Sequence, residues 1–441
     1  MAPSSSRPLR QRHHSSPLLI LLVSLSVLLT SLPISATADG LPELGGGDGL
    51  YREILRDETV LRLNELGKDT VIDAGMYDGS LGIICAISAL KVLKVTGKLQ
   101  RLTRPVEVIA FSDEEGVRFQ TTFLGSAAVA GTLPESILQV SDKSGTTVQD
   151  VLKMNSFEAT STAISQARYN PESVGSYVEV HLEQGPVLEA LRYPLGVVKG
   201  IAGQTRLKVI VDGSQGHAGT VPMKLRRDPM VAAAELVVTL ERLCKEPNKL
   251  LTYDEECSCF TEESLAGLVC TVGELNTWPS ASNVIPGQVN FTVDIRAMDD
   301  QVRETIVTSF SRLVLQKCDD RLVDCKVEHK HSAAATPCDP ELTSQLKRAA
   351  RSTVSAMPGR TVAAASETPV LMSGAGHDAM AMARLTKIGM LFVRCRGGIS
   401  HSPEESVMDD DVWAAGLALF NFIDQNVLAV SEEELEAGQN A

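Results

Sequence analysis

Three aspartates lie among glycines in one short segment of the chain, KDTVIDAGMYDGSLG, which runs from Lys68 to Gly82. A loop of this kind can present carboxylate oxygens to divalent metal ions. The apolar pattern of a helix follows directly after it, so Asp78 is expected near the start of a helix. No histidine lies near this loop, because none occurs between His14 and His181.

Histidines in distinctive surroundings occur later in the chain. Beyond the N-terminal region the histidines are His181, His217, His329, His331, His377 and His401. Four of them stand near glycines, in the segments EVHLEQGP, GSQGHAGTVP, SGAGHDAM and GGISHSPEE. A single histidine is most often structural, but four of this kind, together with Asp78 and Glu115, favour a shared metal site. His329 and His331 match no such pattern and are expected at the surface.

Two adjacent glutamates supply the groups that metal-assisted hydrolysis needs. A carboxylate can bridge two divalent ions, and water held between the ions loses a proton near neutral pH. Glu114 and Glu115 point in different directions because they are neighbours, so one can bind metal while the other acts as general base. The alternative is a solvated acidic turn, which their position directly after a buried strand disfavours.

The elements expected to position these residues alternate between strand and helix. Apolar residues from Ile83 to Leu93 have helical spacing. RPVEVIAFS, which begins at Arg104, predicts a buried strand that ends at the Asp113-Glu114-Glu115 cluster, and a second strand is predicted over Ser176–Leu182. Because ligands collect at the carboxyl ends of strands in open α/β sheets, the acidic cluster is well placed for chemistry.

A different pattern interrupts this one between residues 201 and 332. It reads strand, helix, two strands, helix, strand, which is the ferredoxin-like β-α-β-β-α-β arrangement. A helix, a strand from Lys387 and a final helix, residues 410–426, then resume the first pattern. The fold predicted is α/β: a catalytic domain with a mixed central sheet, in residues 39–200 and 333–429, interrupted by an inserted lid domain in 201–332. The acidic tail, 430–441, is expected to be solvated.

Composition limits the classes of partner. A formal net charge of -14 over 441 residues argues against binding to nucleic acid or to anionic membranes. An anionic small-molecule substrate would need a local basic group. The 44% hydrophobic content with interspersed charge is typical of a globular enzyme.

The N-terminal region has the features of a secretory signal peptide over residues 1–38. Three arginines are followed by an apolar run from Pro17 and by the small residues Ala36-Thr37-Ala38. The alternative is an uncleaved membrane anchor, for which the apolar run is short. We therefore expect the secretory pathway, the endoplasmic reticulum above all, with no membrane contact after cleavage. In that oxidising compartment most of the nine cysteines are expected as buried thiols, with one disulfide possible.

Seven motifs together carry a family resemblance: DTVIDAGMYDGSLG, FSDEEGVRFQTTFLGS, EVHLEQGPVLE, GSQGHAGTVPM, WPSASNVIPG, SGAGHDAMAMA and RGGISHSPEE. The run from about Asp69 to Asn426 resembles the dinuclear metallopeptidase-like amidohydrolases, which include the N-carbamoyl amino acid amidohydrolases and ureidoglycolate amidohydrolase. Within this family the chain is most similar to the plant branch that acts on allantoate.

The resemblance implies a metal centre with two manganese ions per subunit. Asp78 would bridge the ions, Glu115 and His401 would complete one site, and His181 would bind the other ion. Glu114 would be the general base.

The resemblance also implies a homodimer, formed through the lid, and a set of substrate-binding residues. His217 would reach the partner subunit's active site and stabilise the oxyanion of the tetrahedral intermediate. The residues that would hold the substrate are Gln204, His217, Asn283, Arg296, Gly376 and His377. Arg296 has a physical rationale of its own, because a guanidinium can grip a carboxylate with two parallel hydrogen bonds.

The reaction so implied is hydrolysis of a ureido carbonyl of allantoate in purine (ureide) catabolism, giving ammonia, carbon dioxide and ureidoglycine. The alternatives are ureidoglycolate or another N-carbamoyl amino acid as substrate, or a non-catalytic isoform that only dimerises. A metal-dependent exopeptidase is disfavoured because the N-x-I-P-G and D-I-R motifs match the carbamoyl-cleaving branch.

One departure from the family is large. In the family a histidine stands two residues before the aspartate that corresponds to Asp69, and the role of this aspartate in catalysis is to orient that histidine. In this chain Gly67 occupies the position of the histidine. The predicted helix from Tyr51 to Leu66 joins Asp69 almost directly, so the elements that normally lie between are absent. We therefore expect a shortened form that binds fewer than two manganese ions and has little activity, unless another residue replaces the lost ligand.

Overall fold

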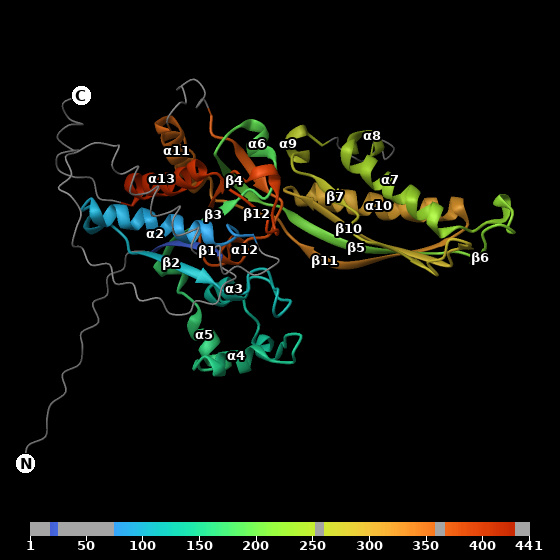
Figure 1. Ribbon diagram of the computed structural model, residues 1–441, viewed down its shortest axis with the longest axis horizontal. Coiled ribbons are helices and arrows are strands. Elements are labelled where there is room, and N and C mark those ends of the chain that lie inside the picture. The colour runs from blue at the N-terminus through green and yellow to red at the C-terminus, as the bar shows by residue number, and fades with distance from the viewer. Residues whose placement is uncertain (1–17, 25–74, 252–259, 358–366, 428–441) are drawn as a thin grey trace, which may run out of the picture. The chain divides into compact units, whose positions relative to one another are not determined.

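The computed structural model describes residues 18–24, 75–251, 260–357 and 367–427 (Figure 1). The chain forms two compact units. Unit 1 comprises residues 1–197, 339–370 and 377–441, and unit 2 comprises residues 198–338 and 371–376. The borders of unit 2 lie a few residues from those predicted for the lid. The short return segment 371–376 is an addition that the sequence pattern did not indicate.

Unit 1 is built on the larger sheet, whose strand order is β12-β4-β14-β3-β1-β2, with β13 paired to β4. The strands of this sheet are β1 (Leu18–Ser24), β2 (Val106–Phe111), β3 (Val174–Leu182), β4 (Leu195–Ile201), β12 (Thr336–Pro337), β13 (Val370–Ser373) and β14 (Ile388–Val393). Of these, β12 and most of β4 and β13 fall within the bounds of unit 2. β1, β2, β3 and β14 are parallel to one another, whereas β12 is antiparallel to β4. The predicted mixed sheet is therefore confirmed. β3 and β14 are almost wholly buried, as expected for central strands.

Helix α13 (Asp409–Asn426) packs against both α2 (Ser80–Val95) and α11 (Pro340–Ala356) beside this sheet (Figure 1). The start of α11 follows from its sequence. Asp339 accepts hydrogen bonds from the backbone N–H groups of Glu341 and Leu342, and Pro340 occupies the first turn. The smaller helices are α3 (Leu124–Ala130), α4 (Val148–Met154), α5 (Ser161–Ala167), α6 (Val187–Leu191) and α12 (Asp378–Met382). No helix of the described residues is both long and apolar enough to cross a membrane.

Strand β1 has an unexpected origin. Leu18–Ser24 lies between β2 and β3 and pairs in parallel with both, from Leu19 opposite Val106 to Ser24 opposite Phe111 on the β2 side. This segment belongs to the predicted signal peptide. The apolar run that cleavage would remove is therefore an internal strand of the sheet in this structure.

Unit 2 has the predicted order of strands and helices. Its sheet has the order β11-β5-β10-β7, with β8 also paired to β10. The strands are β5 (Gly203–Asp212), β7 (Val269–Thr271), β8 (Leu275–Trp278), β10 (Gln288–Ala297) and β11 (Asp324–Ala333). Helices α7 (Pro229–Lys245) and α10 (Asp300–Arg321) pack on this sheet, α8 (Pro247–Leu251) and α9 (Glu262–Leu265) are short, and β6 (Gly216–His217) pairs with β9 (Val284–Ile285). The first of the two consecutive strands predicted between the helices of this unit is divided into β7 and β8.

Two disulfides tie the helices of unit 2 to its strands. Cys244 of α7 is bonded to Cys270 of β7, and Cys318 of α10 is bonded to Cys325 of β11. The sequence indicated that one disulfide was possible, whereas the structure has two, and the spacing of the cysteines does not show which of them pair because pairing depends on which elements become neighbours. The apolar faces of α7, α10, β5 and β10 form one buried cluster around Phe291 and Phe310.

Candidate metal centre

Asp78, Glu115 and His401 come together from three separate loops of unit 1. Asp78 lies two residues before the start of α2, Glu115 follows β2, and His401 follows β14. Nε2 of His401 lies 3.1 Å from Oε1 of Glu115 and 3.4 Å from Oδ2 of Asp78. One ligand atom from each residue lies within 4.8 Å of the other two, which is a spacing that one metal ion can span.

His181 approaches Asp78 from the end of β3. Its Nε2 atom lies 3.1 Å from Oδ1 of Asp78, and its Nδ1 atom lies 3.0 Å from the carbonyl oxygen of Leu182. The backbone carbonyl fixes the ring and leaves Nε2 directed at the carboxylate. Asp78 thus contacts His181 through one oxygen and His401 through the other. This is the arrangement expected of a bridging carboxylate, and it brings all four predicted metal ligands together.

The charges of these groups shift one another's pKa values. Burial raises the pKa of Asp78, but the hydrogen bond and positive charge of His181 outweigh it, so the pKa is lowered overall. Burial acts against protonation of His181, yet Asp78 and Glu179 raise its pKa to about 10. The hydrogen bond that His401 donates to the Glu115 carboxylate is the main cause that raises the pKa of His401 to about 8. Without an ion, protons on the histidines supply the positive charge that the carboxylates require.

Glu114, the predicted general base, is buried, with 7% of its surface exposed. Burial, Asp378 and Glu115 together raise the pKa of its carboxyl group to about 9. A base must be ionised near neutral pH, and the positive charge of a nearby metal ion would lower this pKa. A cation would therefore restore the charge state that the predicted role of Glu114 requires.

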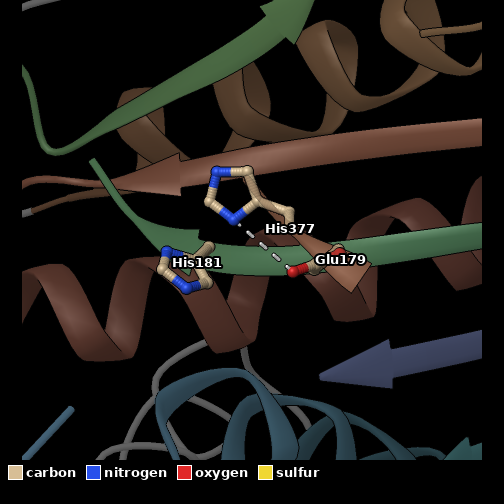
Figure 2. A group of neighbouring side chains, drawn as sticks. All are labelled: Glu179, His181 and His377. Carbon is tan, nitrogen blue, oxygen red and sulfur yellow. Dashed lines mark ion pairs between the residues drawn. The ribbon is translucent and has the colours of Figure 1, made fainter. Parts of the chain in front are cut away.

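A second group of possible ligands adjoins the first. Glu179, His181 and His377 each offer one ligand atom within 4.8 Å of the others, and all three are buried (Figure 2). Glu179 and His181 are two positions apart on β3 and therefore share one face of the strand. The pKa of His377 is well below its usual value because burial and the neighbouring His181 disfavour its charged form. The family resemblance implies that His377 binds substrate, and in this structure its side chain is 1% exposed and packed against the ring of His181.

The residues present fit divalent metal ions. Oε1 of Glu179 and Oδ2 of Asp378 are buried without a hydrogen-bond partner, which is a costly state for a carboxylate that no cation balances. The other Asp378 oxygen, Oδ1, accepts a hydrogen bond of 2.5 Å from Ser126. Imidazole and carboxylate groups are the ligands that manganese and zinc bind. The donor set and the two unpartnered buried carboxyl oxygens therefore both suit cations at this site.

Glu405, which was not predicted as a site residue from the sequence, holds the Asp78 loop in place. Oε1 of Glu405 accepts hydrogen bonds from the backbone N–H groups of Tyr77 (2.9 Å) and Asp78 (3.0 Å). Gly75 makes room for this carboxylate, because a Cβ atom there would lie 1.9 Å from the Glu405 carboxyl carbon. The only signal in the sequence is that Glu405 closes the motif that contains His401, four residues after it.

Arg296 and Gln204 of unit 2 are neighbours across a strand pair, opposite each other on β10 and β5. Nε and Nη2 of Arg296 donate to the two carboxylate oxygens of Asp294 at 2.8 and 3.0 Å, and Nη1 donates to the Gly374 carbonyl at 2.7 Å. A guanidinium has five N–H donors, so one remains on each terminal nitrogen. The predicted grip on a carboxylate can therefore use the Nη1 and Nη2 end of the group.

His217 and Asn283 are also adjacent in unit 2. The backbone N–H of Ala218 donates to the Asn283 carbonyl at 2.9 Å, and the N–H of Gly219 donates to Nδ1 of His217 at 3.1 Å. Because Nδ1 accepts, neutral His217 carries its proton on Nε2, and its exposed ring can donate this proton to an oxyanion. Gly376 belongs to the return segment of unit 2. Asp69, Gly67 and the predicted helix before them lie outside the described residues.

Comparison with known proteins identifies the family. The model of peptidase family M20/M25/M40 matches residues 68–425. A rice protein, "Probable allantoate deiminase" of Oryza sativa subsp. japonica, is 73% identical, with 95% of this chain and 96% of the relative covered. "Allantoate deiminase" of Arabidopsis thaliana is 65% identical, with 81% and 68% covered. A crystal structure of an amidase of the hydantoinase/carbamoylase family from Burkholderia multivorans has a TM-score of 0.68 at 26% identity, with 81% and 79% covered.

The same comparison bears on the missing segment. The alignment with the rice protein runs over 480 positions and this chain has 441 residues, so at least 39 positions of the relative have no counterpart here. The family match begins at residue 68, next to the predicted gap between Leu66 and Asp69. Both findings agree with a chain that is shortened internally.

Proposed function

Because this chain belongs to peptidase family M20/M25/M40, we propose that it is a metal-dependent hydrolase that cleaves a C–N bond of allantoate, releasing ammonia and carbon dioxide and leaving ureidoglycine. The observation that carries the proposal is the position of Asp78 between His181 and His401, beside Glu115 and the buried Glu114. The identity of 73% to a probable allantoate deiminase favours allantoate over other carbamoyl compounds.

The residues of unit 1 divide the catalytic work. Asp78 would hold both ions, with Glu115 and His401 on one side and His181 on the other. Two manganese ions, when bound, would act as Lewis acids and make a water molecule acidic. Glu114 would take a proton from that water and deliver it to the departing nitrogen. Its burial keeps bulk water away from the proton in transit.

The residues of unit 2 would recognise the substrate. The free Nη1 and Nη2 donors of Arg296 would bind the allantoate carboxylate, with Gln204 beside them. His217 would donate from Nε2 to the oxyanion. In a homodimer His217 would do so in the partner subunit's site, and the exposed apolar side chains of Met223, Leu225 and Trp278 in unit 2 support an interface there.

We propose the secretory pathway, most simply the endoplasmic reticulum, as the location. The two disulfides of unit 2 support this proposal because disulfides persist in oxidising compartments. Signal cleavage after Ala38 would also remove β1, so a cleaved chain would need another strand between β2 and β3.

Ammonia release from allantoate tests the proposal. The purified full chain, supplied with manganese, should release ammonia at a rate below that of the rice relative, and Glu114→Gln should abolish the release. Ureidoglycolate and an N-carbamoyl amino acid, assayed in parallel, should react more slowly. A folded chain that acts on none of the three would instead favour a non-catalytic, dimerising subunit.

A further inference from the structure

Three buried side chains next to Asp78 form a group that the predicted mechanism does not fully use. We propose that Glu179, His181 and His377 together bind one divalent transition-metal ion, so that Glu179 and His377 complete the coordination of the ion on the His181 side. This inference rests on the proposed metal-dependent function only for the choice of manganese as the probe.

Glu179 is held as a ligand would be. Its Oε2 atom accepts hydrogen bonds from the hydroxyl of Tyr177 (2.8 Å) and from the backbone N–H of Ala379 (2.9 Å). These two bonds fix the carboxylate, while Oε1 is buried and has no hydrogen-bond partner. An oriented carboxylate with one unsatisfied oxygen is the arrangement that supporting groups give to a metal ligand.

The two histidines face that oxygen from different elements. His181 shares a strand face with Glu179, and His377 precedes α12 (Figure 2). Nδ1 of His377 lies 3.8 Å from Oε1 of Glu179, which is too long for a hydrogen bond. Two ligands that each lie about 2.0 to 2.2 Å from one ion are about 3 to 4.4 Å apart, so one ion could lie within bonding distance of both atoms.

A site with two imidazoles and one carboxylate suits manganese, zinc, cobalt or iron(II) rather than calcium or magnesium. Glu179 and His377 would also compensate for the histidine ligand that the family has at the position of Gly67 and that this chain lacks. The competing explanation is a metal-free network in which a proton on His181 balances Asp78 and Glu179. The two explanations differ in the number of ions that the chain binds.

Metal counting distinguishes them. The full chain, stripped by a chelator and dialysed against manganese, should retain two ions per chain. Glu179→Gln and His377→Gln should each retain one, whereas His329→Gln, which removes an exposed histidine from β11, should retain two. Inserting a segment that carries the histidine which the family resemblance places at the position of Gly67 should make the count insensitive to His377→Gln, because the ion would then have that ligand instead.

Two results would overturn the proposal: one ion in the unmodified chain, or two ions in both the Glu179→Gln and His377→Gln variants. The first result needs no variant, so a folding defect cannot hide it. If His377→Gln does not fold, the ion count of the near-isosteric Glu179→Gln variant alone decides the second result. Folding of each variant is checked by the thermal transition of the metal-free protein. This experiment counts bound ions and does not measure turnover. A chain that hydrolyses allantoate with one bound ion would therefore contradict the proposed site of Glu179, His181 and His377 but not the proposed function.

Discussion

The two units of the chain differ in how their sheets are assembled from the sequence. Unit 2 builds its five-stranded sheet from one nearly continuous stretch of sequence and links both long helices to it with disulfides. Unit 1 collects its sheet from distant segments and takes an internal strand from residues 18–24. Its proposed catalytic residues come from loops after several of those strands, so an internal deletion can leave unit 2 intact while it alters the metal site of unit 1.

The largest expected effect comes from removing β1. Deletion of residues 1–24 would leave the facing edges of β2 and β3 without their hydrogen-bonding partner, and buried unpaired backbone groups are costly. Unit 1 should then become sensitive to limited proteolysis, while fragments of unit 2 survive. Deletion of residues 1–17 is the control and should leave the proteolysis pattern unchanged. Equal resistance of both deletion forms would mean that β1 adds nothing to the sheet.

Removing the disulfides should destabilise unit 2 alone. Cys244 and Cys270 are 26 residues apart and Cys318 and Cys325 only 7, so the first bond restricts the unfolded chain more. Replacing the first pair by serine should lower the free energy of unfolding by about 3 to 4 kcal/mol, and replacing the second by about 2 kcal/mol. Denaturant titration measures both losses. Manganese content should not change, and a loss of manganese in either variant would contradict the separation of the two units.

Glu405→Ala should weaken manganese binding on the order of ten- to a hundredfold, because the backbone of Tyr77 and Asp78 would lose its anchor. Glu404→Ala is the matched control, since Glu404 is the exposed neighbour. Calorimetric titration with manganese gives both affinities. Equal affinities would show that the Asp78 loop keeps its position without Glu405.

The smallest effect concerns pH. The pKa of Glu114 is about 9 in the folded metal-free chain and near the ordinary value of 4.5 when unfolded. Between these two pH values the unfolded state therefore binds fewer protons than the folded state. The contribution of Glu114 to the free energy of unfolding is fully present below about pH 4.5 and is lost as the pH rises toward about 9. The raised pKa of His181 acts in the same direction between its ordinary value of 6.5 and about 10. Between about pH 5 and about pH 9 the melting temperature of the Glu114→Gln variant should fall less than that of the unmodified chain. Parallel curves for the two proteins would contradict the raised pKa of Glu114.

Much of the fold could be predicted from local patterns. The apolar spacing of α2, the buried runs of β3 and β14, and the alternation of β10 each depend on a few consecutive residues. The proposed metal ligands Asp78, Glu115, His181 and His401 could be named from the sequence because each lies in a motif of the family, and the structure brings the four side chains together.

The remainder depends on which distant residues meet. An apolar run such as Leu18–Ser24 is typical both of signal peptides and of buried strands, so its sequence could not place it in the sheet. Glu405 contacts backbone atoms 327 and 328 residues away, and a glutamate in a polar loop gives no sign of that. Glu179 could have been found, because its spacing from His181 puts both on one face of a strand.

The central claim is that the site around Asp78 in unit 1 is a metal-dependent ureide hydrolase centre. Ammonia release from allantoate by the manganese-loaded full chain, compared with its Asp78→Asn variant, tests this claim most directly. The neutral amide in the variant could no longer hold two ions through a charged bridge, so we predict release by the unmodified chain and a fall on the order of a thousandfold or more in the variant. Equal rates in the two proteins would contradict the account, as would no release from a folded chain that binds two ions.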